Sequence, residues 1–306
     1  MKLGLMVGDH SKGGIMSITL KDSSHITDSL NGLGDNGQPL KTIIKHKMSG
    51  GPTRTKIVIT DHNTGEVLGE ICNKILVPGS QVTACKQFGL DPVVNFPTYN
   101  TDLDLDNSYE EWTEEPKNTP ITCLWCAGRD GFGTSPNEVF IVSNTDRIEP
   151  VDDILPFRYV NIDDDLDPDL RDVYFGKRTN ATTGKISYFF KKFDSNPQLH
   201  VVYTDGTEVT SDMWNIVTTQ AVEIYVEMRL AVSRLDFRDY FEEKLGWDNA
   251  DISTISLVTA WYDEFEEGEN VYKFYQDIIP FSKFNFKAED LRDLTRALDF
   301  TYQVFY

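Results

Sequence analysis

The stretch that decides the fold class is VEIYVEMRLAVS, residues 222–233. Its apolar residues recur at every second position, between mostly polar neighbours: Val222, Ile224, Val226, Met228, Leu230 and Val232. Successive side chains of a strand point to opposite faces, whereas a helix would spread these six residues around its whole circumference. The stretch therefore predicts a long, half-buried β-strand.

Short apolar runs separated by turn clusters continue on both sides of this stretch. Two such runs joined by a turn that contains Asn, Asp and Gly are typical of a β-hairpin. We expect three hairpins, with turns at DHNTG (61–65), Asp205-Gly206 and EEGEN (266–270). The strands of the third hairpin are ISTISLVTAWYDEF (252–265) and VYKFYQDIIPFSKFNF (271–286).

Three local patterns extend this picture. EVLGEICNKILV (66–77) is the second strand of the first hairpin, and SQVTACKQFGL (80–90) predicts a short helix that Ser80 caps and Gly89 ends. ALDFTYQVFY (297–306) predicts a final strand. One face of that strand carries alternate residues: Phe300, Tyr302, Val304 and Tyr306.

Together these elements predict a mainly β fold with short helices, either all-β or α+β, built from antiparallel, sandwich-like sheets. Residues 1–50 are rich in Gly, Ser, Asp and Lys, which is typical of an extended or flexible N-terminal arm. A chain of 306 residues has room for one or two domains. We expect a β-rich domain with an acidic loop over residues 51–160. An antiparallel β domain that ends in the C-terminal strand is expected over residues 161–306.

Acidic residues outnumber basic ones and are unevenly distributed. The chain has 29 Lys and Arg against 49 Asp and Glu, a formal charge of −20. Residues 1–100 contain ten basic and eight acidic side chains, a net of +2, whereas residues 101–175 contain five and nineteen, a net of −14. Because nucleic-acid binding depends on cationic groups that contact phosphates, this balance argues against direct DNA or RNA binding. A basic protein partner is compatible with it.

The acidic stretch TDLDLDNSYEEWTEE (101–115) begins like a calcium-binding loop. Its alternating aspartates are the candidate calcium ligands: Asp102, Asp104 and Asp106. An EF-hand loop that started at Asp102 would need glycine at its sixth position and glutamate at its twelfth, but Asn107 and Thr113 stand there. A solvated acidic loop is therefore favoured. NIDDDLDPDLRD (161–172) predicts a second acidic loop or a short helical turn.

Cys123 and Cys126 have the spacing of half a zinc site, and Cys72 and Cys85 are the residues that would complete a four-cysteine set. Twelve residues separate the second pair, and strand alternation points the first pair to opposite faces unless the chain turns. Buried small hydrophobic residues are therefore favoured over zinc ligands.

The N-terminal sequence MKLGLMVGDHSKGG has an apolar stretch too short for a secretory signal. No run approaches the roughly 18 apolar residues that span a bilayer. We therefore expect synthesis in a reducing cytoplasm, free thiols and no membrane insertion.

No catalytic constellation stands out in the sequence. The five histidines are scattered, and neither a G-x-S-x-G elbow nor a phosphate-binding P-loop is present. GRDGFGTS (128–135) joins two strand-like runs without a βα unit, so it does not indicate dinucleotide binding. Carboxylate pairs such as Asp152–Asp153 carry no glycosidase signature. We expect a protein that is not an enzyme and needs no cofactor.

Two stretches carry a resemblance at family level: YQDIIPFSKFNFKAEDLRDLTRALDFTYQVFY (275–306) and NKILVPGSQVTACKQFGLDP (73–92). Together with the acidic, β-rich composition, they resemble uncharacterised virion proteins of tailed bacteriophages, over about residues 50–306. The resemblance transfers no site residues. It implies a structural subunit of the neck, tail or baseplate, or next a head accessory protein, made in the host bacterial cytoplasm and incorporated into the virion. The implied partners are copies of itself and other virion subunits.

Two other classes stay open. A receptor- or carbohydrate-binding β-sandwich module would need an exposed aromatic platform, for which the strand aromatics are candidates: Trp261, Tyr262, Phe274 and Tyr275. A metal-dependent hydrolase would use the acidic loops.

Overall fold

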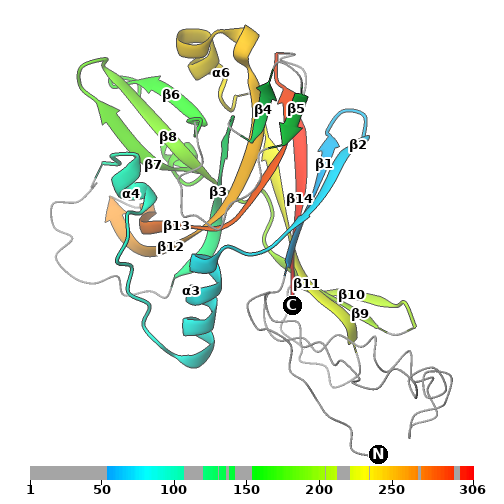
Figure 1. The fold of residues 1–306 in the computed structure, drawn as a ribbon. Helices are drawn as coiled ribbons and strands as arrows, with labels where there is room; N and C mark the ends of the chain where they lie inside the picture. The colour runs from blue at the N-terminus through cyan, green and yellow to red at the C-terminus, as the bar shows by residue number, and fades with distance from the viewer. Residues whose placement is uncertain are drawn as a thin grey trace, which may run out of the picture. The chain divides into compact units, whose positions relative to one another are not determined.

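The computed structural model describes residues 54–106, 120–129, 131–135, 138–141, 154–203, 205–211, 221–233, 235–267, 270–292 and 297–306. The fold of these residues is mainly β, with antiparallel sheets and a few short helices (Figure 1), which confirms the predicted fold class. The strands are β1 (Arg54–Asp61), β2 (Val67–Asn73), β3 (Ile121–Gly128), β4 (Phe132–Ser135), β5 (Glu138–Ile141), β6 (Arg158–Asn161), β7 (Tyr174–Asn180), β8 (Lys185–Lys192), β9 (Gln198–Tyr203), β10 (Glu208–Ser211), β11 (Ala221–Val232), β12 (Asp251–Glu267), β13 (Asn270–Asp290) and β14 (Leu298–Phe305). The helical elements are α3 (Val77–Phe88), α4 (Tyr99–Asp102), α5 (Pro168–Arg171), α6 (Arg238–Tyr240), η2 (Phe241–Leu245) and η3 (Trp247–Asn249).

Two compact units are interleaved along the chain. The larger unit consists of Lys56–Asn196 and Met228–Tyr302. Among the described residues, the smaller unit consists of Arg54 and Thr55, of those within Pro197–Glu227, and of Gln303–Tyr306. The chain therefore passes from one unit to the other several times.

The expected domain boundary between residues 160 and 161 lies inside the larger unit. The expected N-terminal arm, residues 1–50, lies outside the described residues.

The larger unit is a sandwich of two antiparallel sheets. One sheet has the order β13-β12-β3-β8-β6, with β7 also paired to β8. The other follows the order β11-β14-β1-β2. Aromatic rings of the two sheets meet in the core, where the ring centroids of Trp125 of β3 and Phe300 of β14 are 6.3 Å apart. Phe284 of β13 lies 5.1 Å from Tyr302 of β14, between ring centroids. The apolar faces of both sheets are thus buried against each other.

The long hairpin predicted over residues 252–286 is confirmed. Strands β12 and β13 have 17 and 21 residues, and they pair from Asp251 opposite Asp290 to Glu267 opposite Asn270. On its other side β12 pairs with β3. Because β12 is a central strand packed on both faces, adjacent residues such as Leu257 and Val258 are both fully buried.

The smaller unit contains β9 and β10 with the first half of β11 and the end of β14. The hairpin predicted at Asp205-Gly206 is confirmed, since the Tyr203 N–H donates to the Thr207 carbonyl at 2.8 Å. Gly206 has a φ of +84°, a conformation that glycine adopts without steric cost. The strand predicted over residues 222–233 is confirmed as β11.

The predicted helix at residues 80–90 begins earlier than expected. Helix α3 starts at Val77 and not at Ser80, whose N–H already donates within the helix to the Leu76 carbonyl at 3.0 Å. Pro78 stands in the first turn, where a missing N–H costs no hydrogen bond. The end is confirmed, because Gly89 terminates the helix with a φ of +65°.

This early start also shortens the preceding strand, which ends at Asn73 rather than at residue 77. The final strand β14 is confirmed, with alternate residues buried: Leu298, Phe300, Tyr302 and Val304. Tyr306 was expected on the same face, but it follows the end of the strand and is 38% exposed.

Candidate functional site

Two acidic segments that are distant in the sequence both attach to β7. The carboxylate of Asp106 accepts hydrogen bonds from the N–H and the hydroxyl of Thr179, at 2.9 and 2.5 Å. The carboxylate of Asp165 lies 2.7 Å from Lys177 Nζ and accepts a hydrogen bond from the Tyr188 hydroxyl at 2.6 Å. Lys177 and Thr179 stand two residues apart on β7, so sheet formation gathers both acidic segments beside one strand.

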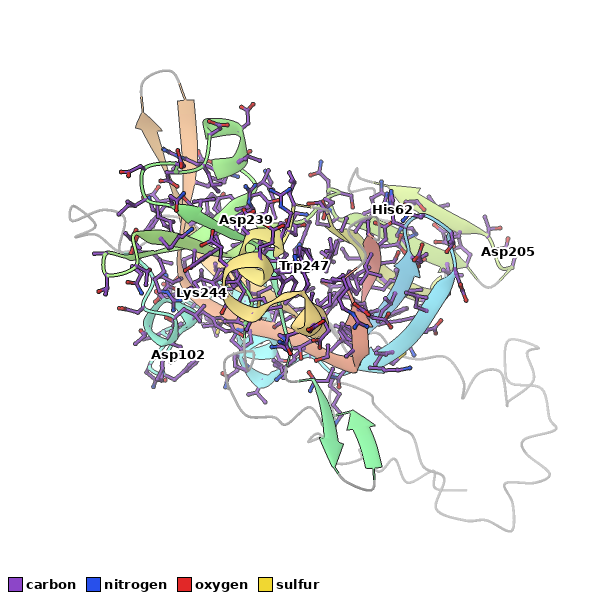
Figure 2. All side chains as sticks on the ribbon, turned by 90° about the horizontal axis from the view of Figure 1, so that it is seen from above. His62, Asp102, Asp205, Asp239, Lys244 and Trp247 are labelled. Atoms are coloured by element: carbon purple, nitrogen blue, oxygen red, sulfur yellow. The ribbon has the colours of Figure 1, made fainter. Side chains whose placement is uncertain are left out.

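The remaining carboxylates of these segments that the structure describes face solvent. We call this group the acidic surface, and Figure 2 shows one of its members, Asp102, on the outside of α4. Its exposed carboxylates are Asp102, Asp104, Asp163, Asp164, Asp167, Asp169 and Asp172.

Burial explains the alternation of aspartate and leucine in residues 102–106. Leu103 and Leu105 are buried in a core cluster that contains Phe190, whereas Asp102 and Asp104 are exposed. Among the candidate calcium ligands, the half-buried Asp106 carboxylate is hydrogen-bonded to the protein itself. In the described ranges, no group of three or more His, Cys, Asp and Glu side chains is placed to hold a metal ion.

Asp165 stays ionised despite partial burial. Burial raises the pKa of this carboxyl, but the hydrogen bonds from Lys177 and Tyr188 outweigh it, so the pKa lies below its usual value. The same carboxylate, together with burial, raises the pKa of the Tyr188 hydroxyl, which therefore remains a donor. This part of the acidic segments is an internal ion pair rather than an open ligand site.

The four cysteines have free thiols in different environments. Cys72 is exposed on β2, and Cys85 is half-buried on α3. Cys123 and Cys126 of β3 both pack on one core cluster. Burial raises the pKa of Cys123 to about 12 and also raises the pKa of Cys126. Both thiols are therefore protonated at neutral pH, and poor nucleophiles.

A β-bulge accounts for the shared environment of Cys123 and Cys126. The register of β3 against β12 shifts between Val258 and Thr259, which leaves Cys123 as the extra residue. The expectation that strand alternation points these two side chains to opposite faces is therefore wrong. Because the bulge adds one residue, the side chains of Cys123 and Cys126 lie on the same side of β3.

Large apolar side chains are exposed at the end of α3 and in the segment that follows it. We call Phe88, Leu90 and Val93 the apolar surface; their exposed fractions are 73, 60 and 86%. Three exposed apolar side chains within six residues make this segment a candidate interaction surface.

The opposite side of the same segment is fixed to the sheet. Val82 of α3 packs on Trp261 of β12 and Ile279 of β13, and Val94 and Phe96 pack on the same cluster. Figure 1 shows α3 beside β12 and β13. The apolar surface is therefore held on a rigid support in the larger unit.

A buried ion pair between Lys191 and Asp236 was not found from the sequence. Lys191 belongs to the run FFKKFD (189–194), which reads as the polar end of a strand. Its Nζ lies 3.0 Å from Asp236 Oδ2, and the side chains are only 5 and 0% exposed. The sequence signal that could have indicated burial of Lys191 is its position two residues after Phe189, which is buried on the same strand.

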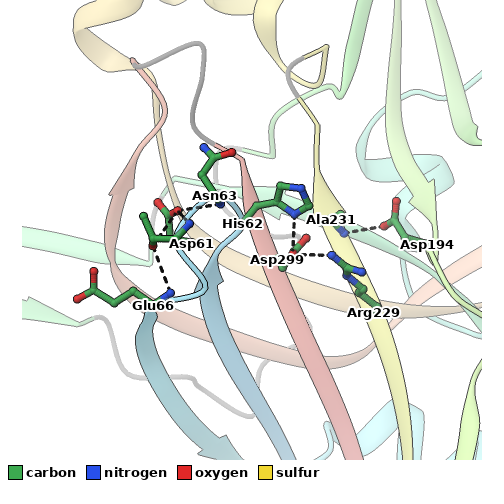
Figure 3. Close-up of polar contacts among 9 residues, drawn as sticks. Asp61, His62, Asn63, Glu66, Asp194, Arg229, Ala231 and Asp299 are labelled. Carbon is green, nitrogen blue, oxygen red and sulfur yellow. Dashed lines mark hydrogen bonds and ion pairs between the residues drawn. The ribbon is translucent and has the colours of Figure 1, made fainter.

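A second polar cluster lies at the surface of the larger unit. The Asp299 carboxylate accepts a hydrogen bond from Arg229 at 2.6 Å, and His62 Nδ1 lies 2.8 Å from the same oxygen (Figure 3). Asp61 closes the neighbouring β1–β2 turn by accepting hydrogen bonds from the Asn63 and Thr64 N–H groups. His62 and Arg229 are both half-exposed, so this cluster is a surface ion-pair network.

Comparison of the chain with protein-family models, with curated protein sequences and with solved structures gives no match. The fold and the contacts above therefore define the class of protein on their own, which is an antiparallel β protein with a supported apolar surface and an acidic surface. Within the described residues, no helix is long and apolar enough to cross a membrane.

Proposed function

We propose that the chain is a structural subunit of a tailed-bacteriophage virion, in the neck, tail or baseplate, that acts through protein–protein assembly. The observation that carries the proposal is the apolar surface of Phe88, Leu90 and Val93. The family-level resemblance of residues 73–92 and 275–306 supplies the virion context.

The apolar surface has the properties of an interface anchor. Burying a large apolar side chain contributes about 1.5–3 kcal/mol. Aromatic anchors such as Phe88 often dominate binding energy at the centre of an interface. The occupant we propose is a second copy of this chain, because assembly subunits present the same surfaces to identical neighbours.

This surface is one part of the interface. Stable interfaces bury about 800 Å² on each partner, more than three side chains supply. The acidic surface is suited to the polar rim and to a basic neighbour, because like charges disfavour contact between two acidic surfaces.

The aromatic strand residues do not support a sugar-binding platform. Trp261 and Tyr275 are 8 and 6% exposed and pack in the core of the larger unit. Among the described residues, the aromatic side chains that stand out to solvent are Phe88 and Tyr306, which belong to different units. We therefore propose no carbohydrate-binding function.

Light scattering coupled to size-exclusion chromatography, with electron microscopy of the eluted species, tests the proposal. The wild-type chain is expected to form larger species as its concentration rises. The double variant Phe88→Ser, Val93→Ser is expected to remain monomeric. Ile162→Ser is the matched control, because Ile162 is 44% exposed in a turn away from α3.

A monomeric wild-type chain at all concentrations would contradict assembly with copies of itself. Equal assembly of wild type and the double variant would contradict the role of the apolar surface. Circular dichroism of each variant verifies that the fold is retained.

A further inference from the structure

The core of the larger unit holds an amine and a carboxyl group in contact. Lys191 Nζ lies 3.0 Å from Asp236 Oδ2. The two side chains are 5 and 0% exposed. Buried charges are costly unless they are paired, and here the two groups pair with each other.

Strand pairing places Lys191 between two aromatic residues. Lys191 of β8 stands opposite Trp125 of β3 on one side and opposite Tyr174 of β7 on the other. Its Nζ lies 6.0 Å from each of these ring centroids. The rings exclude water from the contact between Lys191 and Asp236.

Further polar groups surround the Lys191–Asp236 pair, and one of them, the Ala231 carbonyl, accepts a hydrogen bond from Lys191 Nζ at 2.6 Å. The Tyr174 hydroxyl donates a hydrogen bond to Oδ1 at 2.7 Å, and the Ser233 N–H donates to Oδ2 at 2.7 Å. A second carboxyl group, that of Asp194, has its Oδ1 3.5 Å from Lys191 Nζ. The site thus contains a nucleophile (the Lys191 amine) and an electrophile (Cγ of Asp236). It also contains a hydrogen-bond donor for a developing oxyanion (the Tyr174 hydroxyl) and a proton carrier (the Asp194 carboxyl group).

We propose that Lys191 and Asp236 condense to an intramolecular isopeptide bond. The proton of the ion pair passes from Lys191 Nζ to Asp236 Oδ2, the amine that results attacks Cγ, and the C–N bond forms. The bond between Cγ and Oδ2 then breaks, and this oxygen leaves as water after receiving a proton. One amine and one carboxyl group become one amide and one water, with no change of oxidation state.

Asp194 and Tyr174 have distinct roles in this step. The Asp194 carboxyl group transfers the proton from the attacking amine to the departing oxygen. Burial raises the pKa of Asp194, which makes its carboxylate a better proton acceptor for this transfer. The Tyr174 hydroxyl stabilises the negative charge that develops on Oδ1. Burial and the Asp236 carboxylate raise the pKa of Tyr174, so the hydroxyl keeps its proton.

The bond would join β8 to the turn that follows β11, two segments that are 45 residues apart in the sequence. Such a cross-link constrains the unfolded chain as a disulfide does, and needs no oxidising compartment. The inference stands independently of the proposed function, because it concerns one folded chain.

Intact mass spectrometry of the purified, denatured full chain tests the proposal. The expected mass is lower than the sequence mass by about 18 Da, one water. Tandem mass spectrometry after proteolysis is expected to find one branched peptide that contains both Lys191 and Asp236. The full sequence mass would overturn the proposal, as would a lost water located elsewhere, for example at Asp205-Gly206.

Variants distinguish the roles of the residues. Lys191→Arg keeps the positive charge and is expected to show its full sequence mass. Asp194→Asn is expected to close the bond more slowly, seen as unlinked chain in early samples; closure at the wild-type rate would overturn the role of Asp194. Lys185→Arg alters the more exposed ion pair with Glu243 and is the control that is expected to keep the lost water.

Discussion

The phenol ring of Tyr225 lies flat on the imidazole of His200, with ring centroids 4.5 Å apart and an angle of 9° between the planes. Glu208 joins the two rings, because its Oε1 lies 2.6 Å from His200 Nδ1 and accepts a hydrogen bond from the Tyr225 hydroxyl at 2.7 Å. The three residues come from β9, β10 and β11 of the smaller unit. The trio therefore fixes the order of these strands through side chains as well as backbone.

Tyr225→Phe is expected to raise the pKa of Glu208. Hydrogen bonds from Tyr225, and then from His200, hold the pKa of this carboxyl below its usual value. A group with a lowered pKa in the folded state stabilises the fold above its unfolded pKa, and the contribution is lost as the pH falls through the folded pKa. In wild type, the stability of the smaller unit is thus expected to decline as the pH falls into the acid range. In the variant, this decline is expected to occur at a higher pH.

A carboxyl NMR titration of Glu208 measures this shift. Tyr203→Phe removes a hydroxyl from a neighbouring position of β9 and is the control that is expected to leave the Glu208 pKa unchanged. An unchanged pKa in Tyr225→Phe would show that the hydrogen bond to Tyr225 does not set it.

Asp106→Ala is expected to destabilise the larger unit by about 1–3 kcal/mol, because Thr179 loses the acceptor of two hydrogen bonds. Asp102→Ala removes an exposed carboxylate of the same segment, and a change of about 0.5 kcal/mol or less is expected. Chemical denaturation of both variants measures the difference. Equal effects would mean that the segment is not anchored through Asp106.

Calcium is expected to leave the melting temperature of the protein unchanged. The most buried of the three candidate carboxylates, Asp106, is already occupied by Thr179, and Asp102 and Asp104 are exposed. Ligand binding to the folded state raises stability with concentration, so thermal melts with CaCl₂ and with EDTA are a direct test. A rise in melting temperature that EDTA reverses would restore the calcium-binding hypothesis.

Gly79→Ala is expected to destabilise the larger unit by about 1–3 kcal/mol through overpacking. A Cβ at this position of α3 would lie 2.7–2.9 Å from the side chain and backbone of Phe281. Gly69→Ala is the control, since its Cβ would meet only Ile59 Cδ1 at 3.8 Å and its effect should stay within about 1 kcal/mol. Equilibrium unfolding of the two variants should separate them clearly, and similar stabilities would contradict the close contact of α3 with β13.

Deletion of residues 1–50 is expected to leave the β fold intact and to weaken self-association. The first strand of the described fold, β1, starts at Arg54, after the deleted segment. Circular dichroism measures the fold, and light scattering measures association. Loss of the β signal would instead show that residues 1–50 are part of the core.

Local sequence patterns were enough to predict the strands and hairpins named above. Alternation over residues 222–233 and the turn residues Asp205-Gly206 act within a few residues of chain, where backbone geometry sets the outcome. Gly89 likewise ended α3 where the sequence placed its end. The start of α3 at Val77 differed because Pro78 and the packing of Gly79 on Phe281 outweigh the capping preference of Ser80.

Which residues come into contact depends on the tertiary structure. The β-bulge at Cys123, the attachment of Asp106 and Asp165 to β7, and the burial of Lys191 beside Asp236 all depend on pairing between strands that are distant in sequence. The alternation of apolar and polar residues along a strand predicts which residues share a face. It does not predict which other strand that face packs against. From the sequence, Lys191 in FFKKFD could be either solvated at the end of a strand or buried. Lys191 is buried because the register of β8 places it between β3 and β7.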